Sequence, residues 1–321
     1  SASTEQISIN ETQFRTLADA NQGAVIPAPS ATVTFDAKAM DAINGASSTG
    51  NVILTIKKID QSTLTSEQQK RVDNRPVYDF TLTKGDQQIS SFDGGHARIS
   101  IPYTLGDGEN PHQVVIYYLT SDGNLKPLKG HYDANSECVI FETTHFSIYA
   151  VGYNPVSFND VAHGAWYKDA VDFIAAREIT SGTSIGTFSP EAKLIRGQFI
   201  VLLMNAYGIS PDANDEGTTN FVDAGNTYYT KYLLSAKSLG IVNGVGNNLF
   251  APEKEITRQE MFVMLHNALK VIDEIPEVVI SKDLSSFSDV NQIDDWANEA
   301  FKTLVNAGIV TGSNNKLNPT H

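Results

Sequence analysis

The feature that most constrains this chain is a unit that occurs three times between residues 158 and 321. Each copy opens on Phe-x-Asp and continues to an aromatic residue, which is Trp166, Tyr228 or Trp296. Sixteen residues after each aromatic stands a glycine, which is Gly182, Gly244 or Gly312, and a proline follows seven or eight residues later. A unit this small cannot bury its own apolar stripe, so the copies are expected to share a core as one domain.

Each copy has the pattern of a helix, a glycine-ended turn, a short extended segment, a proline and a second helix. Apolar residues recur at helical spacing around Phe173 in the first helix and around Leu202 in the second. We interpret the repeated glycines as the left-handed residues at the ends of the first helices. The aspartates of the opening motif, Asp160, Asp223 and Asp289, are interpreted as caps of the turn that follows them.

The second copy contains a helix-start motif, Ile-Thr-Arg-Gln-Glu at 256–260, directly before an apolar run. Thr257 and Glu260 have the spacing of a capping box, which predicts that a helix begins at Arg258. The Arg258 guanidinium would then lie beside unpaired backbone N–H groups at the positive end of the helix dipole. This arrangement suits a carboxylate, which an arginine binds with two parallel hydrogen bonds.

The other two copies depart from this motif. In the first copy Ile195 replaces the threonine and is followed by Arg196 and Gln198, so the charge is kept while the side-chain cap is lost. Such a loss costs about 1 kcal/mol of helix-start stability. The third copy reaches His321 before any arginine motif, which leaves a third site undefined. A bundle lacking one helix would expose apolar surface, which another chain could cover.

The frame Phe-x-Asp-Val, Trp-Tyr, Gly-Ile-x-x-Gly, Phe-x-Pro and Ile-Thr-Arg-x-Glu resembles the surface-layer homology (SLH) repeat of bacterial envelope proteins. The resemblance implies an all-α, pseudo-threefold bundle of three repeats at 156–210, 219–273 and 285–321, the last incomplete. It also implies non-covalent attachment to an anionic secondary cell-wall polysaccharide linked to peptidoglycan, often carrying pyruvate ketals. The implied location is extracellular, at the bacterial cell surface.

The expected ligand-binding residues are those at the helix starts together with the repeated aromatics and glycines. They are Arg258, Arg196, Thr257, Glu260, Gln198, Trp166, Tyr228, Trp296, Gly182, Gly244 and Gly312. The aromatic faces would stack on sugar rings, and the glycines would let a sugar approach closely. Two alternatives stay open: the aromatics belong to the core, and the arginines are structural residues satisfied by solvent or a neighbouring carboxylate.

Residues 1–153 have a different pattern, in which short runs of β-branched and aromatic residues alternate with Gly, Asp and Asn turns. This pattern predicts an antiparallel β-sandwich with strands at 31–35, 52–56, 77–82, 97–101, 113–119, 137–142 and 147–151. Helical turns are expected at 11–20 and 37–43. We place the boundary with the repeat domain, 154–321, at Asn154-Pro155. This part is similar to β modules that precede SLH triplets in surface-layer proteins and surface-bound polysaccharidases.

Composition and motifs argue against several functional classes. The formal net charge of −14 disfavours nucleic acid, and no run approaches the roughly 18 apolar residues that a membrane span needs. The seven histidines lack metal-ligand spacing and the single cysteine, Cys138, cannot join them, so we expect no metal and no cofactor. A calcium role for the acidic loops 93–94 and 212–216 stays open, although neither loop has EF-hand spacing. No nucleophile elbow, phosphate-binding loop or dinucleotide fingerprint occurs.

The leading hypothesis is therefore a non-catalytic module that anchors its protein to the cell wall. One alternative is a structural surface-layer protein whose β module self-associates into a lattice. Another is the non-catalytic tail of a surface-anchored enzyme that degrades polysaccharides.

Overall fold

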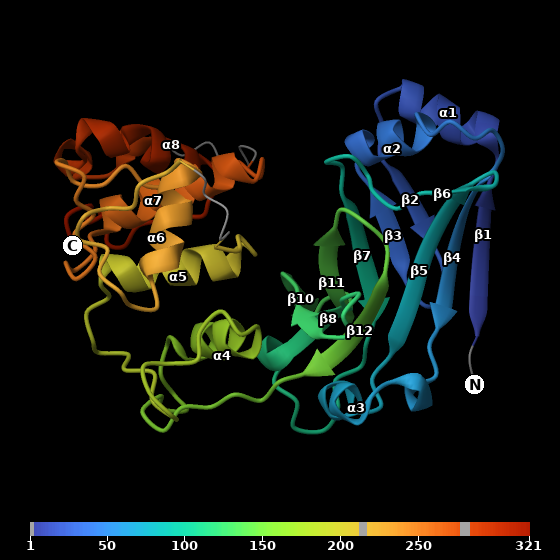
Figure 1. Ribbon diagram of the computed structural model, residues 1–321, viewed down its shortest axis with the longest axis horizontal. Coiled ribbons are helices and arrows are strands. Elements are labelled where there is room, and N and C mark those ends of the chain that lie inside the picture. Colours follow the sequence, from blue (N-terminus) through green and yellow to red (C-terminus); the bar gives the residue numbers. More distant parts are fainter. Residues whose placement is uncertain (1–2, 212–216, 277–282) are drawn as a thin grey trace. The chain divides into compact units, whose positions relative to one another are not determined.

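The computed structural model describes residues 3–211, 217–276 and 283–321 (Figure 1). The acidic loop 212–216 lies outside these residues. The chain divides into two compact units, Ser1–Ser189 and Pro190–His321. The first unit contains two antiparallel β-sheets, and the helices of the second unit come from the repeats. The predicted combination of a β module with an α-helical repeat region is confirmed.

The β-sheets of the first unit comprise seven and five strands, all paired antiparallel. The larger sheet has the order β1-β4-β5-β12-β8-β9, with β6 beside β5. Its strands are β1 (Thr4–Ile9), β4 (Val52–Lys58), β5 (Val77–Lys84), β6 (Gln87–Gln88), β8 (Val114–Leu119), β9 (Leu125–Pro127) and β12 (Ile148–Tyr153). The smaller sheet has the order β10-β11-β7-β3-β2. Its strands are β2 (Ala24–Pro27), β3 (Thr32–Phe35), β7 (Ala97–Pro102), β10 (Gly130–Asp133) and β11 (Cys138–Thr143).

All seven predicted strands are present, and the expected helical turns are α1 (Glu11–Asp19) and α2 (Ala37–Asn44). The two sheets share one core, because every second residue of each strand points inward. Val52, Leu54 and Ile56 of β4 face this core, as does the Ala97, Ile99 and Ile101 series of β7. Helices α1 and α2 lie side by side at one end of the sandwich and add Phe14 and Met40 to the same cluster (Figure 1).

The first helix of the first copy, α4 (Lys168–Ala176), also belongs to this unit. Ala176 packs with Tyr117 and Val115 on the other face of the larger sheet, where α3 (Ser66–Val72) also contributes. The next residue, Arg177, is buried and donates to the carbonyl oxygens of Gly130, His112 and Val114 at 2.6–3.0 Å. Its partners are neutral, and burial lowers the pKa of Arg177 to about 10. The strands therefore end at Tyr153, while the compact unit continues to Ser189.

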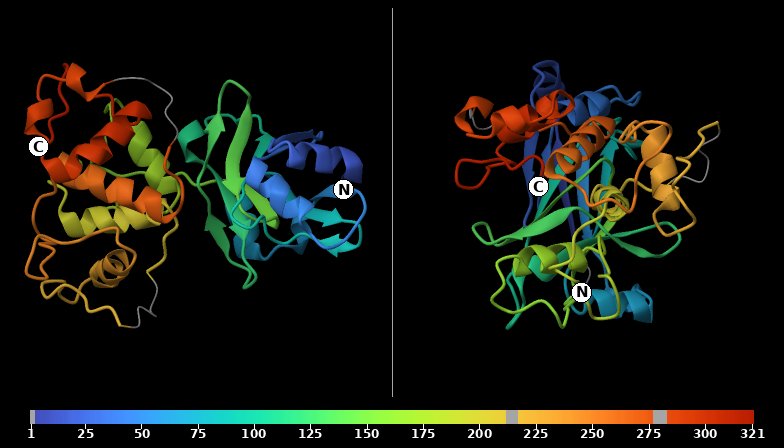
Figure 2. Two further views of the ribbon diagram at one scale, coloured as in Figure 1. Left: turned by 90° about the horizontal axis from the view of Figure 1, so that it is seen from above. Right: turned by 90° about the vertical axis from the view of Figure 1, so that its left-hand side faces the viewer.

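The second unit contains α5 (Arg196–Ala206), α6 (Thr230–Ser238), α7 (Arg258–Val271) and α8 (Asn298–Asn306), which pack against one another (Figure 2). Short 3₁₀ turns at Leu284–Ser286, Val290–Gln292 and Asp295–Ala297 precede α8. Ile200 and Met204 of the first copy pack with Phe221 and Phe250 of the second. Phe262 of the second copy packs similarly with residues of the third. Neighbouring copies therefore share cores, as units too small to bury their own stripes must.

The aspartates of the opening motif close each copy onto itself. Each carboxylate accepts two backbone N–H groups from a segment 27–29 residues later, at 2.7–2.9 Å. Asp160 accepts from Phe188 and Ser189, Asp223 from Phe250 and Ala251, and Asp289 from Leu317 and Asn318. Our interpretation of these aspartates as caps of the next turn is therefore wrong, because their acceptor atoms are used by a distant loop.

The repeated glycines also have a different role from the one expected. The left-handed residues that follow α4, α6 and α8 are Glu178, Gly240 and Gly308, four positions earlier in each copy. Gly244 lies in the following turn, with φ of +78°, and a Cβ there would lie 2.4 Å from Leu249 O and 2.7 Å from Phe221 Cε1. Gly182 and Gly312 have equivalent surroundings. Glycine is required by the backbone conformation and by the close approach of the loop.

We expect Gly244→Ala to lower the free energy of unfolding more than Gly240→Ala does. Both backbones are left-handed, which costs alanine about 1 kcal/mol, but nothing lies within 4 Å of a Cβ at Gly240. Overlap at Gly244 adds an overpacking cost, for a total of about 2–4 kcal/mol. Urea unfolding, followed through Trp296 fluorescence in a Trp166→Phe background, measures both changes. Equal losses of unfolding free energy in the two variants would show that the contacts of the Gly244 turn with Leu249 O and Phe221 add no cost.

The contribution of Asp289 to stability should depend on pH. Burial raises the pKa of this carboxyl, but hydrogen bonds from the Leu317 and Asn318 N–H groups outweigh that effect and hold the pKa below its ordinary value. Its stabilisation is thus complete above the unfolded-state pKa of about 3.9 and is lost as the pH falls through the lower folded value. Asp289→Asn should cost roughly 2 kcal/mol at pH 6 and less near pH 3.

Urea midpoints measured across this pH range test the expectation for Asp289. The exposed Asp295→Asn variant provides the control, because Asp295 lies in the same copy and is solvent-exposed. A loss of stability in Asp289→Asn that is the same at pH 6 and pH 3 would contradict the role of the ionised carboxylate.

Candidate functional site

Two grooves lie at equivalent positions in the second unit, each between an arginine at a helix start and the glycine turn of the next copy. Groove 1, of about 460 Å³, joins Arg196 of the first copy to residues 241–245 of the second. Groove 2, of about 440 Å³, joins Arg258 of the second copy to residues 309–313 of the third. The predicted arginines and glycines therefore meet between neighbouring copies and not within one copy.

Both helix starts are held by the proline loop of the next copy. Arg196 N donates to Lys254 O (3.0 Å) and Gly197 N to Pro252 O (2.9 Å). The equivalent bonds at α7 run from Arg258 N to His321 O (2.7 Å) and from Gln259 N to Pro319 O (2.8 Å). The expectation that backbone N–H groups at these positions are free for an anion is therefore wrong, because carbonyl groups of the next copy already accept them.

The two guanidinium groups are positioned by the same loops. Arg196 Nε donates to Phe250 O (2.9 Å), and Arg258 Nε donates to Leu317 O (2.8 Å). Each guanidinium also lies over an aromatic ring, that of Phe250 at 4.5 Å or that of Phe262 at 5.0 Å. These contacts fix the plane of each guanidinium at the edge of its groove, so its terminal nitrogens are ordered before a ligand arrives.

The capping box at the start of α7 is confirmed. Thr257 N donates to Glu260 Oε2 (2.9 Å), and Glu260 N donates to Thr257 Oγ1 (3.3 Å). At the start of α5 only one of the two capping-box hydrogen bonds is present, in which Ile195 N donates to Gln198 Oε1 (3.2 Å). The other is missing because the isoleucine side chain has no acceptor atom. Each helix begins at the predicted arginine.

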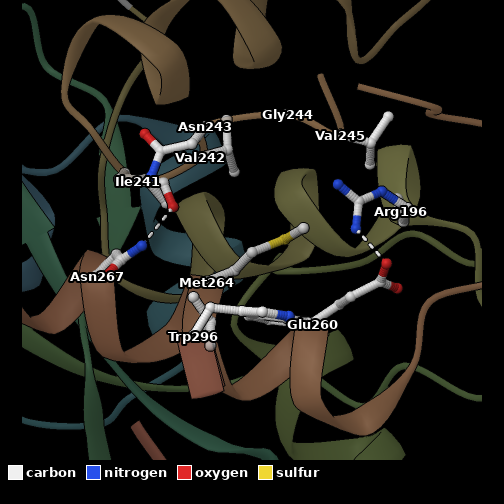
Figure 3. Close-up of a pocket in the computed structure, with 11 residues that line it drawn as sticks. Arg196, Ile241, Val242, Asn243, Gly244, Val245, Glu260, Met264, Asn267 and Trp296 are labelled. Atoms are coloured by element: carbon white, nitrogen blue, oxygen red, sulfur yellow. Dashed lines mark hydrogen bonds and ion pairs between the residues drawn. The ribbon is translucent and has the colours of Figure 1, made fainter. Parts of the chain in front are cut away.

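The two arginines differ in their carboxylate contacts. Arg196 Nη1 lies 2.9 Å from Glu260 Oε1, and the two side chains are only 4% and 12% exposed (Figure 3). Burial raises the pKa of Glu260, but hydrogen bonds from Thr257 N–H and Lys254 and the charge of Arg196 hold it below its ordinary value. Within residues 3–211, 217–276 and 283–321, no carboxylate oxygen lies at ion-pair distance from the Arg258 guanidinium.

The predicted aromatics are exposed, so the alternative that they belong to the core is wrong. Trp166 is 93% exposed, Tyr228 58% and Trp296 54%. Trp296, from the third copy, lines groove 1 opposite the glycine turn (Figure 3). Partial burial and the negative charge of Glu253 raise the pKa of Tyr228. A hydrogen bond with Gln198 lowers it, but the pKa remains above its ordinary value. Trp166 and Gly182 belong to the other compact unit, Ser1–Ser189.

Several groove residues were not predicted. Asn243 and Asn267 line groove 1, where Asn267 Nδ2 donates to Ile241 O (3.1 Å), and Asn318 lines groove 2. Asn243 could have been found, because the position before the glycine carries a polar residue in every copy. Asn267 and Asn318 carry no comparable signal, since each reaches its groove only through packing between copies.

The described residues contain no group of three or more His, Cys, Asp or Glu side chains placed to hold a metal ion. Among the helices of that same part of the chain, none combines the length and apolar character needed to cross a bilayer.

Comparison with known protein families identifies the repeats. The S-layer homology domain matches residues 157–200, 220–262 and 286–321. The chain carries three S-layer homology repeats. Grooves 1 and 2 lie between these SLH repeats, and the β module precedes them.

Relatives that share the SLH repeats include surface-layer proteins and enzymes. The S-layer protein EA1 of Bacillus anthracis is 28% identical over 163 residues, which is 51% of this chain and 18% of EA1. The exoglucanase XynX of Acetivibrio thermocellus is 29% identical over 157 residues, 49% of this chain and 14% of XynX. These findings identify an SLH-bearing protein of the cell surface, with a role in surface anchoring.

The similarity also reaches the β module. The amylopullulanase of Thermoanaerobacterium thermosulfurigenes is 28% identical over 220 residues, 68% of this chain and 12% of that enzyme. This stretch is longer than the whole region of the three SLH repeats, so it includes residues that precede them. The chain spans less than a fifth of the length of each of these three relatives.

We expect Arg196→Ala to destabilise the repeat unit more than Arg258→Ala. Removing Arg196 takes one of two cations away from the largely buried Glu260 carboxylate and also removes a hydrogen bond to Phe250 O, which together cost roughly 3 kcal/mol. Arg258→Ala removes a hydrogen bond to Leu317 O and no ion pair, which costs about 1–2 kcal/mol. Urea unfolding of both variants provides the comparison, and a greater loss from Arg258→Ala would contradict it.

Proposed function

We propose that this chain anchors its protein to the bacterial cell wall by binding an anionic secondary cell-wall polysaccharide in the grooves between SLH repeats. The observation that carries the proposal is the repeated meeting of an oriented arginine and a glycine turn from the next copy. Each groove lies within the range of about 300–1,000 Å³ usual for small-molecule sites.

Groove 2 has the chemistry for an acidic sugar. A pyruvate ketal presents a carboxylate, and the planar guanidinium of Arg258 can donate two parallel hydrogen bonds to it. Thr311, Ser313 and Asn318 line the same groove and offer hydroxyl and amide groups to the sugar ring. Gly312 keeps the turn narrow, because any Cβ there would overlap Phe287 and Lys316 O.

The net charge of −14 does not oppose this binding. At physiological ionic strength, exposed charges more than about 8 Å away are largely screened. The electrostatic potential at a bound carboxylate therefore depends mainly on the charged groups that line the groove. For the same reason, binding should weaken as salt rises.

The β module is compatible with two kinds of parent protein, a surface-layer protein and a surface-anchored enzyme. Both surface-layer proteins and enzymes are similar to this chain over the SLH repeats, and the amylopullulanase is similar beyond them. Self-association of the β module would make the protein part of a surface lattice. An upstream catalytic domain would instead make the chain the non-catalytic tail of a polysaccharide-degrading enzyme.

Arg258→Ala should weaken retention on purified wall sacculi roughly tenfold or more, since a charge-assisted hydrogen bond contributes about 1.5–3 kcal/mol. Arg196→Ala should have a smaller effect, because Glu260 already occupies its guanidinium. Co-sedimentation of the folded fraction measures retention. Lys231→Ala is the charge-matched control, since Lys231 is exposed and lines neither groove.

One outcome would contradict the proposal, and a second would contradict only the expected order of the two variants. Retention that survives chemical removal of the secondary polymer from the sacculi would show that the polymer is not the ligand. Equal weakening by Arg196→Ala and Arg258→Ala would show that the two grooves do not differ as their ion pairs indicate.

A further inference from the structure

The first helix of the first copy, α4, departs from its equivalents α6 and α8 at three positions. Six, eleven and twelve residues after the repeated aromatic, the first copy has Asp172, Arg177 and Glu178. The second copy has Leu234, Leu239 and Gly240 there, and the third has Lys302, Ala307 and Gly308. The buried apolar position five residues after the aromatic is kept in every copy, as Val171, Leu233 and Phe301. The first copy therefore keeps the repeat frame and changes only part of the helix surface.

Arg177 is one of these departures, and its side chain is inserted into the β module. Its guanidinium donates to the carbonyl oxygens of Gly130, His112 and Val114 at 2.6–3.0 Å. Arg177 is 6% exposed, whereas Leu239 at the equivalent position of the second copy is 43% exposed. The five donors of a guanidinium can reach several carbonyl groups at once, and a leucine or alanine has none to offer.

Asp172 also contacts the β module. It is 2% exposed, and its Oδ2 accepts a hydrogen bond from Asn110 Nδ2 at 2.8 Å. Lys168, one turn earlier in α4, forms an ion pair with the same oxygen. A buried carboxylate is stable only with partners of this kind, so the aspartate belongs to the contact between the helix and the module.

Glu178 has a backbone conformation that favours glycine. Its φ is +58°, and the equivalent Gly240 and Gly308 have φ of +75° and +72°. A residue with a Cβ is disfavoured in this left-handed region. The Glu178 carboxylate forms an ion pair with Arg71 of α3, in the β module. A strained residue that replaces glycine in one copy alone indicates a role for its side chain.

Apolar contacts join the same two elements. Ala176 packs with Tyr117 and Val115 on the larger sheet, and both of these sheet residues are fully buried. Asn154 Nδ2 donates to Ala176 O at 2.8 Å, close to the end of the helix. Loss of α4 would expose this face of the sheet and leave the carbonyl partners of Arg177 without their donor. The helix and the sheet therefore stabilise each other.

We infer that α4 is a docking helix for the β module, so that the first repeat is the joint that holds this module and the two unfold as one cooperative unit. This inference goes beyond the proposed function and does not depend on polymer binding. On its other side α4 packs through Val171 with Phe158 and Phe188 of its own copy, so one helix serves both the repeat and the sheet. In either kind of parent protein, the β module would then be attached by a packed interface and not by a free linker at Asn154.

Hydrogen exchange of the native full-length chain tests the inference without a variant. Amide exchange is followed by mass spectrometry at increasing urea concentrations below the unfolding transition. The amides of α4 should open with the same free energy and the same urea dependence as those of β8 and β12, because they share one cooperative unit. Amides of α4 that exchange through a smaller opening than those of the two strands would overturn the inference.

A substitution taken from the second copy sharpens the test. Arg177→Leu should raise the exchange rate in α4 roughly tenfold or more relative to α6 and α8, since its charge-assisted hydrogen bonds to three carbonyl groups are lost. Arg15→Leu is the matched control, because Arg15 lies in the same unit with its side chain 55% exposed. This control should leave exchange in α4 unchanged.

The variants give clear outcomes. Faster exchange in α4, alone or together with β8 and β12, while α6 and α8 keep their protection would support the docking role. Unchanged exchange in α4 of Arg177→Leu would overturn it, as would an equal increase in α6. Asp172→Asn takes the place of Arg177→Leu if that variant does not fold, because it keeps the side-chain shape and weakens the contacts with Asn110 and Lys168. It should also raise exchange in α4 selectively, and an unchanged rate would have the same consequence.

Discussion

The start of one repeat's second helix is held by the proline loop of the next repeat, and this contact places everything else in the second unit. Backbone N–H groups of α5 and α7 donate to carbonyls near Pro252 and Pro319, and the arginine Nε atoms donate to Phe250 O and Leu317 O. A helix N-terminus must satisfy its unpaired donors, and here the neighbouring copy does so. The grooves follow because these contacts bring an arginine to the glycine turn of another copy.

The loops that make these contacts are themselves tightly restrained. Asp223 holds two consecutive N–H groups next to the proline, and Gly244 permits the turn to approach Leu249 O and the ring of Phe221. A loop fixed at both ends presents its carbonyl groups in one geometry. The cost of ordering a binding site is then met during folding and not when the ligand binds.

Surface anchoring by an acidic protein becomes physically reasonable in this arrangement. Most of the negative charge is screened from a ligand, whereas each guanidinium lies at the edge of a groove. In groove 1 the guanidinium of Arg196 also faces a carboxylate of the neighbouring copy, because the capping residue of the second copy, Glu260, lies 2.9 Å from Arg196 Nη1.

The sequence by itself determined the features that depend on near neighbours. Strand alternation, helical periodicity and the Thr257–Glu260 capping box involve atoms a few residues apart, so the seven predicted strands and the beginning of α7 at Arg258 could be read directly. Short or polar strands such as β10 and β1 were missed, because their pairing depends on partners elsewhere. Only the tertiary structure decided that Arg196 meets Glu260, that Asp223 holds a loop 27 residues later, and that Trp296 is exposed in groove 1. These contacts join residues tens of positions apart, and packing between copies selects them where no local pattern does.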